Sequence, residues 1–238
     1  MCTGLAKRVP LEVTGLAFLL AAVLAWPQRA AAAPTSVMLT IDGERVAALY
    51  WLPARTGLEK VPGVVLLHML GRAKEDWRVF GDLLKSSGYA AIALDLRGGG
   101  NVGKAKLIGD ARAGYAFLAR QQEVDAARLG VIGASIGANA ALLFAVEEPR
   151  VKCAALLSPG LNYRGVATDW AITQMKRPLL LVASDDDDYS AQSVRRLEQL
   201  ATGLKTVKIY SRAGHGTEIF AANAGLDQEL LAFLKAHL

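Results

Sequence analysis

Gly133-Ala134-Ser135-Ile136-Gly137 is the stretch of sequence that decides the fold. It follows the apolar run 129–132 and precedes the helix-forming segment 138–145. A strand, a sharp turn and a helix in that order are the context in which G-x-S-x-G presents a serine hydroxyl as a nucleophile. The turn strains the serine backbone and brings the neighbouring strand and helix close together. Glycines are needed at both ends of the motif, because any side chain there would collide with them. The pattern also fits a tight turn in which Ser135 only caps a helix, so the rest of the chain must decide.

Short apolar runs alternate with amphipathic segments from residue 37 to the end of the chain. The segments 37–41 and 46–52 predict an antiparallel pair of strands turned at Asp42-Gly43. Further strands are predicted over 64–69, 89–96, 129–134, 151–158, 178–184 and 205–210, and helices over 74–87, 108–122, 191–200 and 226–238. This alternation predicts an α/β fold with a mostly parallel twisted sheet and helices on both faces. The segment 159–177 is the least periodic, so we expect little or no cap.

The first 32 residues have a different character from the rest. Lys7 and Arg8 precede the apolar run 16–25, and small residues follow at Ala30 and Ala32. This pattern is typical of a secretory signal peptide, cleaved here after Ala32. The apolar run is shorter than the roughly 20 residues that span a bilayer, although an uncleaved membrane anchor is the alternative. We therefore expect a secreted or periplasmic protein, without stable membrane insertion after cleavage, whose domain covers 33–238.

Composition and charge argue against a nucleic-acid-binding protein and against a fold held by disulfides. The chain has 238 residues, of which 53% are hydrophobic and 21% charged, which suffices for one core. The net charge of +5 falls to roughly +3 without residues 1–32, too little and too scattered for nucleic-acid binding. Cys153 is the single cysteine left after cleavage, so no intramolecular disulfide can form, and it is expected to be a buried small hydrophobe. Nothing in the sequence indicates an oligomeric state.

A serine nucleophile needs a base, and the base needs an orienting carboxylate. Of the three histidines, His215 lies between glycines in a loop after the strand 205–210, whose carboxyl end shares a rim with Ser135. His68 is expected to brace the loop after its strand, and His237 to lie on the surface of the last helix. The acid is expected among residues 185–188, four aspartates that follow the strand 178–184. Like charges repel, so most of them should be solvated.

The tetrahedral intermediate of acyl transfer needs two N–H donors for its oxyanion. One should be the N–H of Ile136, directly after the nucleophile. The other should come from the loop after the strand 64–69, where the N–H of Met69 is best placed.

The segments 66–71, 95–100, 133–137, 185–188 and 214–216, in this chain order, resemble motifs of the α/β-hydrolase superfamily. The resemblance covers residues 36–238 and is greatest to a small, nearly capless branch that includes dienelactone-hydrolase-like and secreted esterase-like members. In that superfamily the acid commonly lies three residues beyond the small residue that ends the strand, which implies Asp187, with Asp188 and Asp185 as alternatives.

The chain departs from the family pattern at two places. Arg97-Gly98-Gly99-Gly100 stands where R-G-H-G is frequent, and we expect this turn to lie away from the chemistry. Ser135 stands where dienelactone hydrolases proper carry a cysteine nucleophile, so their lactone specificity is not implied.

The expected function is a serine hydrolase that cleaves small carboxylic esters through an acyl-enzyme, without a metal or organic cofactor. A small-peptide or amide hydrolase is the first alternative, because the same triad cleaves both bonds. Two others are a catalytically silent binding protein on the same fold and, if the signal stays uncleaved, a membrane-anchored interaction protein.

Overall fold

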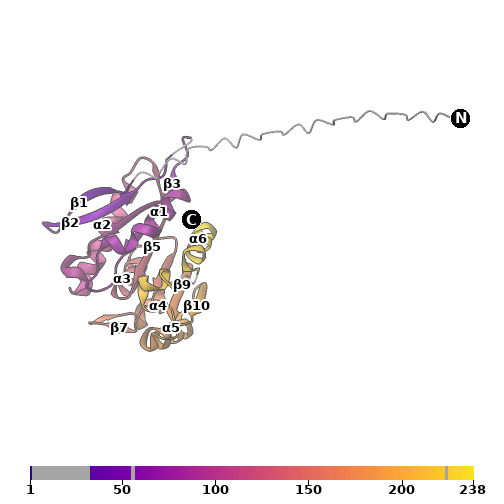
Figure 1. Cartoon of the computed structure of the whole chain (residues 1–238). Coiled ribbons are helices and arrows are strands. Elements are labelled where there is room, and N and C mark those ends of the chain that lie inside the picture. The colour runs from indigo at the N-terminus through magenta and orange to yellow at the C-terminus, as the bar shows by residue number, and fades with distance from the viewer. Residues whose placement is uncertain (2–32, 55–56, 223–224) are drawn as a thin grey trace. The chain divides into compact units, whose positions relative to one another are not determined.

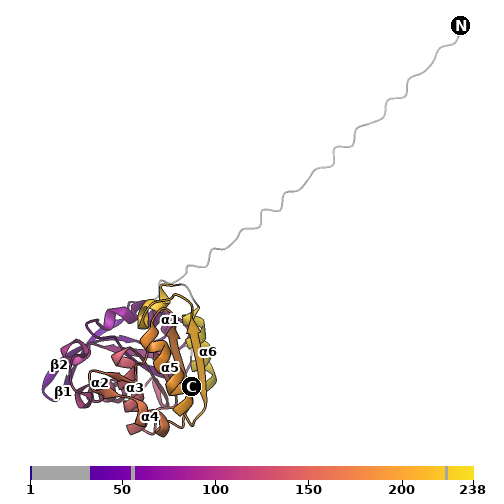
Figure 2. The same ribbon diagram turned by 90° about the horizontal axis from the view of Figure 1, so that it is seen from below.

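The computed structural model describes residue 1 and residues 33–54, 57–222 and 225–238. The predicted signal peptide therefore lies outside the described residues, apart from Met1. From residue 33 onward, an eight-stranded sheet lies between two layers of helices (Figures 1 and 2). No helix in these ranges is long and apolar enough to cross a membrane.

The sheet has the order β1-β2-β4-β3-β5-β6-β9-β10. Its strands are β1 (Thr35–Ile41), β2 (Glu44–Trp51), β3 (Val61–Leu67), β4 (Ala90–Leu94), β5 (Val124–Ala134), β6 (Ala154–Leu157), β9 (Leu179–Ser184) and β10 (Lys205–Tyr210). The β1–β2 and β2–β4 pairs are antiparallel, and the other pairs are parallel. This is the α/β-hydrolase fold, which confirms the predicted fold class.

Buried strands divide their side chains between two cores. In β4, Ile92 and Leu94 belong to one hydrophobic cluster and Ala91 and Ala93 to the other, because successive side chains point to opposite faces. The first cluster includes residues of α2 (Lys104–Ala119), α3 (Ile136–Glu147), α4 (Asp169–Gln174) and α5 (Asp188–Leu200). The second includes residues of η1 (Lys74–Trp77), α1 (Arg78–Ser86) and α6 (Leu226–His237). Cys153 is buried in the second cluster, as expected.

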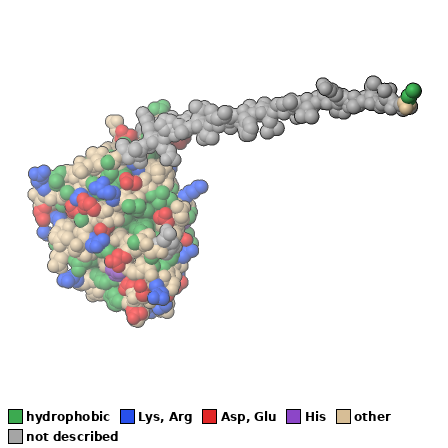
Figure 3. All heavy atoms as spheres, viewed as in Figure 1, with side chains coloured by type: hydrophobic (Ala, Val, Ile, Leu, Met, Phe, Trp, Pro, Cys, Tyr) green, Lys and Arg blue, Asp and Glu red, His purple; other side chains and the backbone are tan. Residues whose placement is uncertain are grey.

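The aperiodic segment contains structure that the sequence did not predict. A small hairpin of β7 (Asn162–Tyr163) and β8 (Val166–Ala167) precedes α4 (Figure 1). Strands of two residues are too short to produce a hydrophobic period. On the face seen in Figure 3, Lys and Arg side chains are interspersed with Asp and Glu.

Candidate active site

Ser135 joins β5 to α3 with a left-handed backbone, at φ 55° and ψ −121°. A Cβ atom on Gly133 would lie 2.1 Å from the carbonyl oxygen of Gly137. A Cβ atom on Gly137 would lie 2.5 Å from the carbonyl oxygens of Leu67 and His68. Both contacts are with backbone, so only glycine fits at either position. The Ser135 side chain makes no capping hydrogen bond to α3, which leaves the simple helix-cap interpretation without support.

The N–H groups of Met69 and Ile136 are the two predicted oxyanion donors. Met69 follows β3, and Ile136 begins α3. Within the described part of the chain, neither N–H donates to another protein group. Both residues line the same cavity as Ser135. Two free donors beside a nucleophile are what stabilisation of an oxyanion requires.

His68 ties the loop after β3 to the end of β4. Its Nε2 accepts a hydrogen bond from the N–H of Leu96 at 2.8 Å, so Nδ1 carries the proton and donates to the carbonyl of Met69 at 2.6 Å. Burial lowers the pKa of His68, outweighing the Met69 carbonyl and nearby carboxylates that favour protonation. His68 therefore braces this loop as a neutral imidazole, as the sequence predicted.

His215 follows β10 and contacts the acid-bearing end of β9. Its Nδ1 lies 2.5 Å from Oδ2 of Asp187. The other oxygen of Asp187 accepts the N–H of Ser190 at 3.3 Å, at the start of α5. Burial by itself raises the pKa of Asp187, but the hydrogen bonds from Ser190 and His215 lower it on balance. The carboxylate is therefore charged at neutral pH and can orient the imidazole.

Two of the other aspartates hold the loop that carries His215. Asp185 accepts hydrogen bonds from the hydroxyl of Ser211 at 2.9 Å and the N–H of Arg212 at 2.7 Å. Asp186 accepts from Gly214 N–H at 3.2 Å and also from the Ser184 hydroxyl. Both aspartates are exposed, as expected, and in addition they hold the 211–214 loop, a role that was not predicted.

Ser135 and His215 open onto one cavity of about 380 Å³. Its lining consists of Met69, Leu70, Arg72, Ser135, Ile136, Tyr163, Arg164, His215 and Glu218. Four of the five predicted site residues therefore share a cavity, and Asp187 stands behind His215. No hydrogen bond joins Ser135 to His215 among the described residues. Such bonds often tighten only in a substrate complex.

Five residues that line this cavity were not predicted from the sequence: Leu70, Arg72, Tyr163, Arg164 and Glu218. Tyr163 and Arg164 reach it from the β7–β8 hairpin, where only the Arg164-Gly165 turn could have indicated a hairpin. The Arg97–Gly100 turn was expected to lie away from the chemistry, and this prediction is wrong. The N–H of Gly71 donates to the carbonyl of Gly99 at 2.8 Å, and a Cβ atom on Gly100 would lie 3.2 Å from Ile136. The triple glycine lets this turn pack against the loop after β3.

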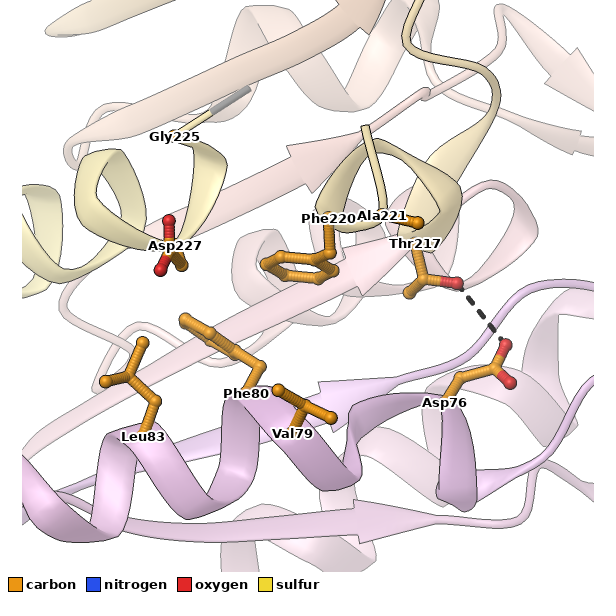
Figure 4. A pocket seen from close by; sticks show the side chains of 9 residues that line it. All are labelled: Asp76, Val79, Phe80, Leu83, Thr217, Phe220, Ala221, Gly225 and Asp227. Carbon is orange, nitrogen blue, oxygen red and sulfur yellow. Dashed lines mark hydrogen bonds between the residues drawn. The ribbon is translucent and has the colours of Figure 1, made fainter. Parts of the chain in front are cut away.

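A second hollow, of about 350 Å³, lies between α1 and the segment from η3 (Gly216–Phe220) to α6 (Figure 4). It is mainly apolar, and Phe80 and Phe220 stack across it with centroids 5.2 Å apart. The hydroxyl of Thr217 donates to Asp76 at 3.3 Å at one end. None of the predicted site residues lines this hollow.

Comparison with known proteins shows the family of this chain. The sequence profile of the Dienelactone hydrolase family matches residues 46–227. The rat (Rattus norvegicus) protein named "Putative protein-lysine deacylase ABHD14B" is 33% identical over 182 residues, which cover 72% of this chain and 83% of that protein.

Two solved structures with low sequence identity share the fold. Dienelactone hydrolase from Anabaena variabilis ATCC 29413 matches with a TM-score of 0.71 at 19% identity, covering 87% of this chain and 100% of its own. Acetyl xylan esterase from Paenibacillus sp. R4 matches with a TM-score of 0.74 at 19% identity, covering 91% of this chain and 87% of its own.

Proposed function

This chain belongs to the dienelactone hydrolase family of α/β-hydrolases, and from that premise we propose that it is a serine hydrolase of small carboxylic esters. The observation that carries the proposal is the constellation at one cavity: the strained Ser135, the free N–H groups beside it, and His215 held by Asp187. A cavity of about 380 Å³ is at the lower end of the range for small-molecule sites, which favours a short acyl group.

In the first half of the proposed reaction, Ser135 is acylated by the ester. Ser135 Oγ bonds to the acyl carbon, and its proton passes to His215, whose imidazolium faces the Asp187 carboxylate. The N–H groups of Met69 and Ile136 receive the oxyanion. The bond from carbon to the alcohol oxygen then breaks, and the proton leaves with the alcohol.

Deacylation reverses these roles with water. The water oxygen bonds to the acyl carbon and gives a proton to His215. The bond to Ser135 then breaks, and Ser135 regains its proton as the carboxylic acid departs. We further propose that this chemistry takes place outside the cytoplasm, after removal of the signal peptide 1–32.

The test replaces Ser135 by alanine in the full-length protein. Hydrolysis of short-chain nitrophenyl esters should fall by about 10³-fold or more, and labelling by a fluorophosphonate should disappear. Ser86→Ala, at the exposed end of α1, is the matched control and should behave as wild type. Retention of most activity in Ser135→Ala contradicts the proposal, and a wild-type protein that neither labels nor hydrolyses any ester indicates a silent binding protein.

A second candidate is hydrolysis of an amide. Its support is the name of the rat relative ABHD14B, which describes a protein-lysine deacylase and thus cleavage of an acyl-lysine amide. Deacylation of acetyl-lysine peptides that is lost in Ser135→Ala and exceeds ester turnover in kcat/KM would favour this candidate.

A further inference from the structure

Tyr163 stands beside both the predicted nucleophile and the predicted base. Its side chain lines the cavity together with Ser135 and His215. Its ring meets the imidazole of His215 edge-on, with centroids 6.3 Å apart and planes at 90°. On the other side it packs against the ring of Tyr189, at 5.4 Å.

The hairpin that carries Tyr163 is fixed to the helix that follows Ser135. Asn139 is fully buried in α3, and its side-chain amide donates to the carbonyls of Gly160 at 3.0 Å and Val166 at 2.7 Å. It also accepts the N–H of Gly160 at 3.1 Å. A Cβ atom on Gly160 would lie 2.7 Å from the Tyr163 ring, so the ring packs directly on the backbone. Because Asn139 is one turn from Ser135, Tyr163 has a defined position relative to the nucleophile.

The hydroxyl of Tyr163 has two protein partners. It lies 2.9 Å from Ser190 Oγ, where either oxygen can donate, and it donates to the carbonyl of Ser158 over a long distance of 3.3 Å. When Ser190 donates to the phenol oxygen, the phenol proton can turn from the Ser158 carbonyl to an acceptor in the cavity. Burial raises the pKa of Tyr163 to about 12, with the hydroxyls of Ser190 and Ser135 acting in the opposite direction. The phenol is therefore a neutral donor at any physiological pH.

In acyl transfer by this site, the leaving alcohol oxygen must receive its proton from His215 while it is still close to Ser135. A side chain that lies beside both Ser135 and His215, as Tyr163 does, therefore faces the departing alcohol. The water that ends the cycle reaches His215 from the same side. Resting on the function proposed above, we propose that the Tyr163 hydroxyl is a catalytic group that hydrogen-bonds the leaving oxygen and then the incoming water. It transfers no proton itself, so the proton balance between Ser135 and His215 is unchanged.

The experiment compares two tyrosine-to-phenylalanine variants of the full-length protein. Tyr163→Phe should lower kcat on nitrophenyl esters by about 10- to 100-fold, the value of one hydrogen bond to a developing charge, with KM within about twofold of wild type. Tyr189→Phe is the matched control, since its hydroxyl holds the same hairpin through the N–H and carbonyl of Asn162 at 3.0 and 3.1 Å. It should change kcat far less, while both variants lower the melting temperature by a similar amount of a few degrees, since each loses two hydrogen bonds.

A second readout separates catalysis from hairpin order. With methanol added, the acyl-enzyme partitions between methyl ester and acid. If Tyr163 holds the attacking water, Tyr163→Phe raises the ratio of ester to acid and Tyr189→Phe leaves it unchanged. Equal effects of the two variants on kcat and on this ratio, or no effect of Tyr163→Phe while Ser135→Ala is inactive, overturn the inference and leave the proposed function intact. If activity survives in Ser135→Ala, both the inference about Tyr163 and the proposed function are contradicted.

Discussion

Among single residues, Ser135 shows how a local sequence can specify a strained conformation. A left-handed backbone at a serine costs of order 1–3 kcal/mol and persists only where the surroundings enforce it. The enforcement comes from Gly133 and Gly137, whose missing side chains let α3 approach the ends of β5 and β3. This turn was predictable because its requirements lie within five consecutive residues.

His68 is a second residue whose surroundings determine its state. Its Nε2 must stay unprotonated to accept the N–H of Leu96, and burial lowers its pKa. As pH falls below the ordinary histidine value of about 6.5, the unfolded chain therefore takes up a proton that the folded chain refuses. Folding stability attributable to His68 is complete above that pH and decreases below it.

This linkage gives a prediction for pH-dependent unfolding. Between pH 7.5 and pH 5.5, the free energy of unfolding of the wild type should fall more than that of His68→Gln, by up to about 1.4 kcal/mol per pH unit below 6.5. Urea titrations at both pH values measure the difference. All the other ionisable residues are present in both proteins, so their contributions cancel in the comparison. Equal pH dependence of the two proteins would show that His68 is not held neutral in the fold.

At the scale of secondary-structure elements, the carboxyl ends of β9 and β10 act as one unit. Asp187 contacts His215, while Asp185 and Asp186 accept hydrogen bonds from residues 211–214. The sequence indicated that an acid of this run would face His215. It could not indicate the clamping of the loop, because those bonds join residues 26 to 28 positions apart.

The four aspartates should therefore differ in a graded way. Asp187→Asn should lower kcat/KM by about 10³-fold or more, since it removes the charge that faces the imidazolium. Asp185→Ala and Asp186→Ala should each cost about 3- to 10-fold, the value of one or two net hydrogen bonds that hold the loop. Asp188→Asn, at the exposed first position of α5, is the control. Steady-state kinetics on one ester rank the four, and the greatest loss at Asp188 would contradict the placement of the acid.

At the scale of the whole molecule, the parts predicted from sequence are those with a period. The buried parallel strands and their covering helices repeat apolar residues at fixed spacing, so their positions along the chain could be predicted. The β7–β8 hairpin has no period, and its position depends on Asn139, more than 20 residues away from the residues it holds. Tyr163 thus entered the candidate site through tertiary contacts alone. The position of the Arg97–Gly100 turn was mispredicted for the same reason, since its partners Gly71 and Ile136 are distant in sequence.

The sheet also defines where the folded domain must begin. β1 pairs with β2 from Thr35 opposite Tyr50 to Ile41 opposite Glu44, and Val46 and Ala48 are buried beneath this pairing. Removal of residues 2–32 should leave that edge intact and yield a folded enzyme with wild-type kcat/KM and urea midpoint. Removal of residues 2–41 is the matched control. It removes β1, the outer neighbour of β2, and the product should unfold at lower urea or aggregate through the exposed edge.

The same boundary predicts the product of the export that we propose for this chain. Cleavage after Ala32 leaves only two residues ahead of β1, so a signal peptidase could remove the leader without disturbing the sheet. The exported protein should have an intact mass that corresponds to residues 33–238, and it should remain in the supernatant after membranes are sedimented. The apolar run 16–25 is too short to anchor a helix comfortably across a bilayer of roughly 30 Å. A mass that retains residues 1–32, together with membrane association that resists high salt, would instead establish an uncleaved anchor and place the hydrolase at the membrane surface.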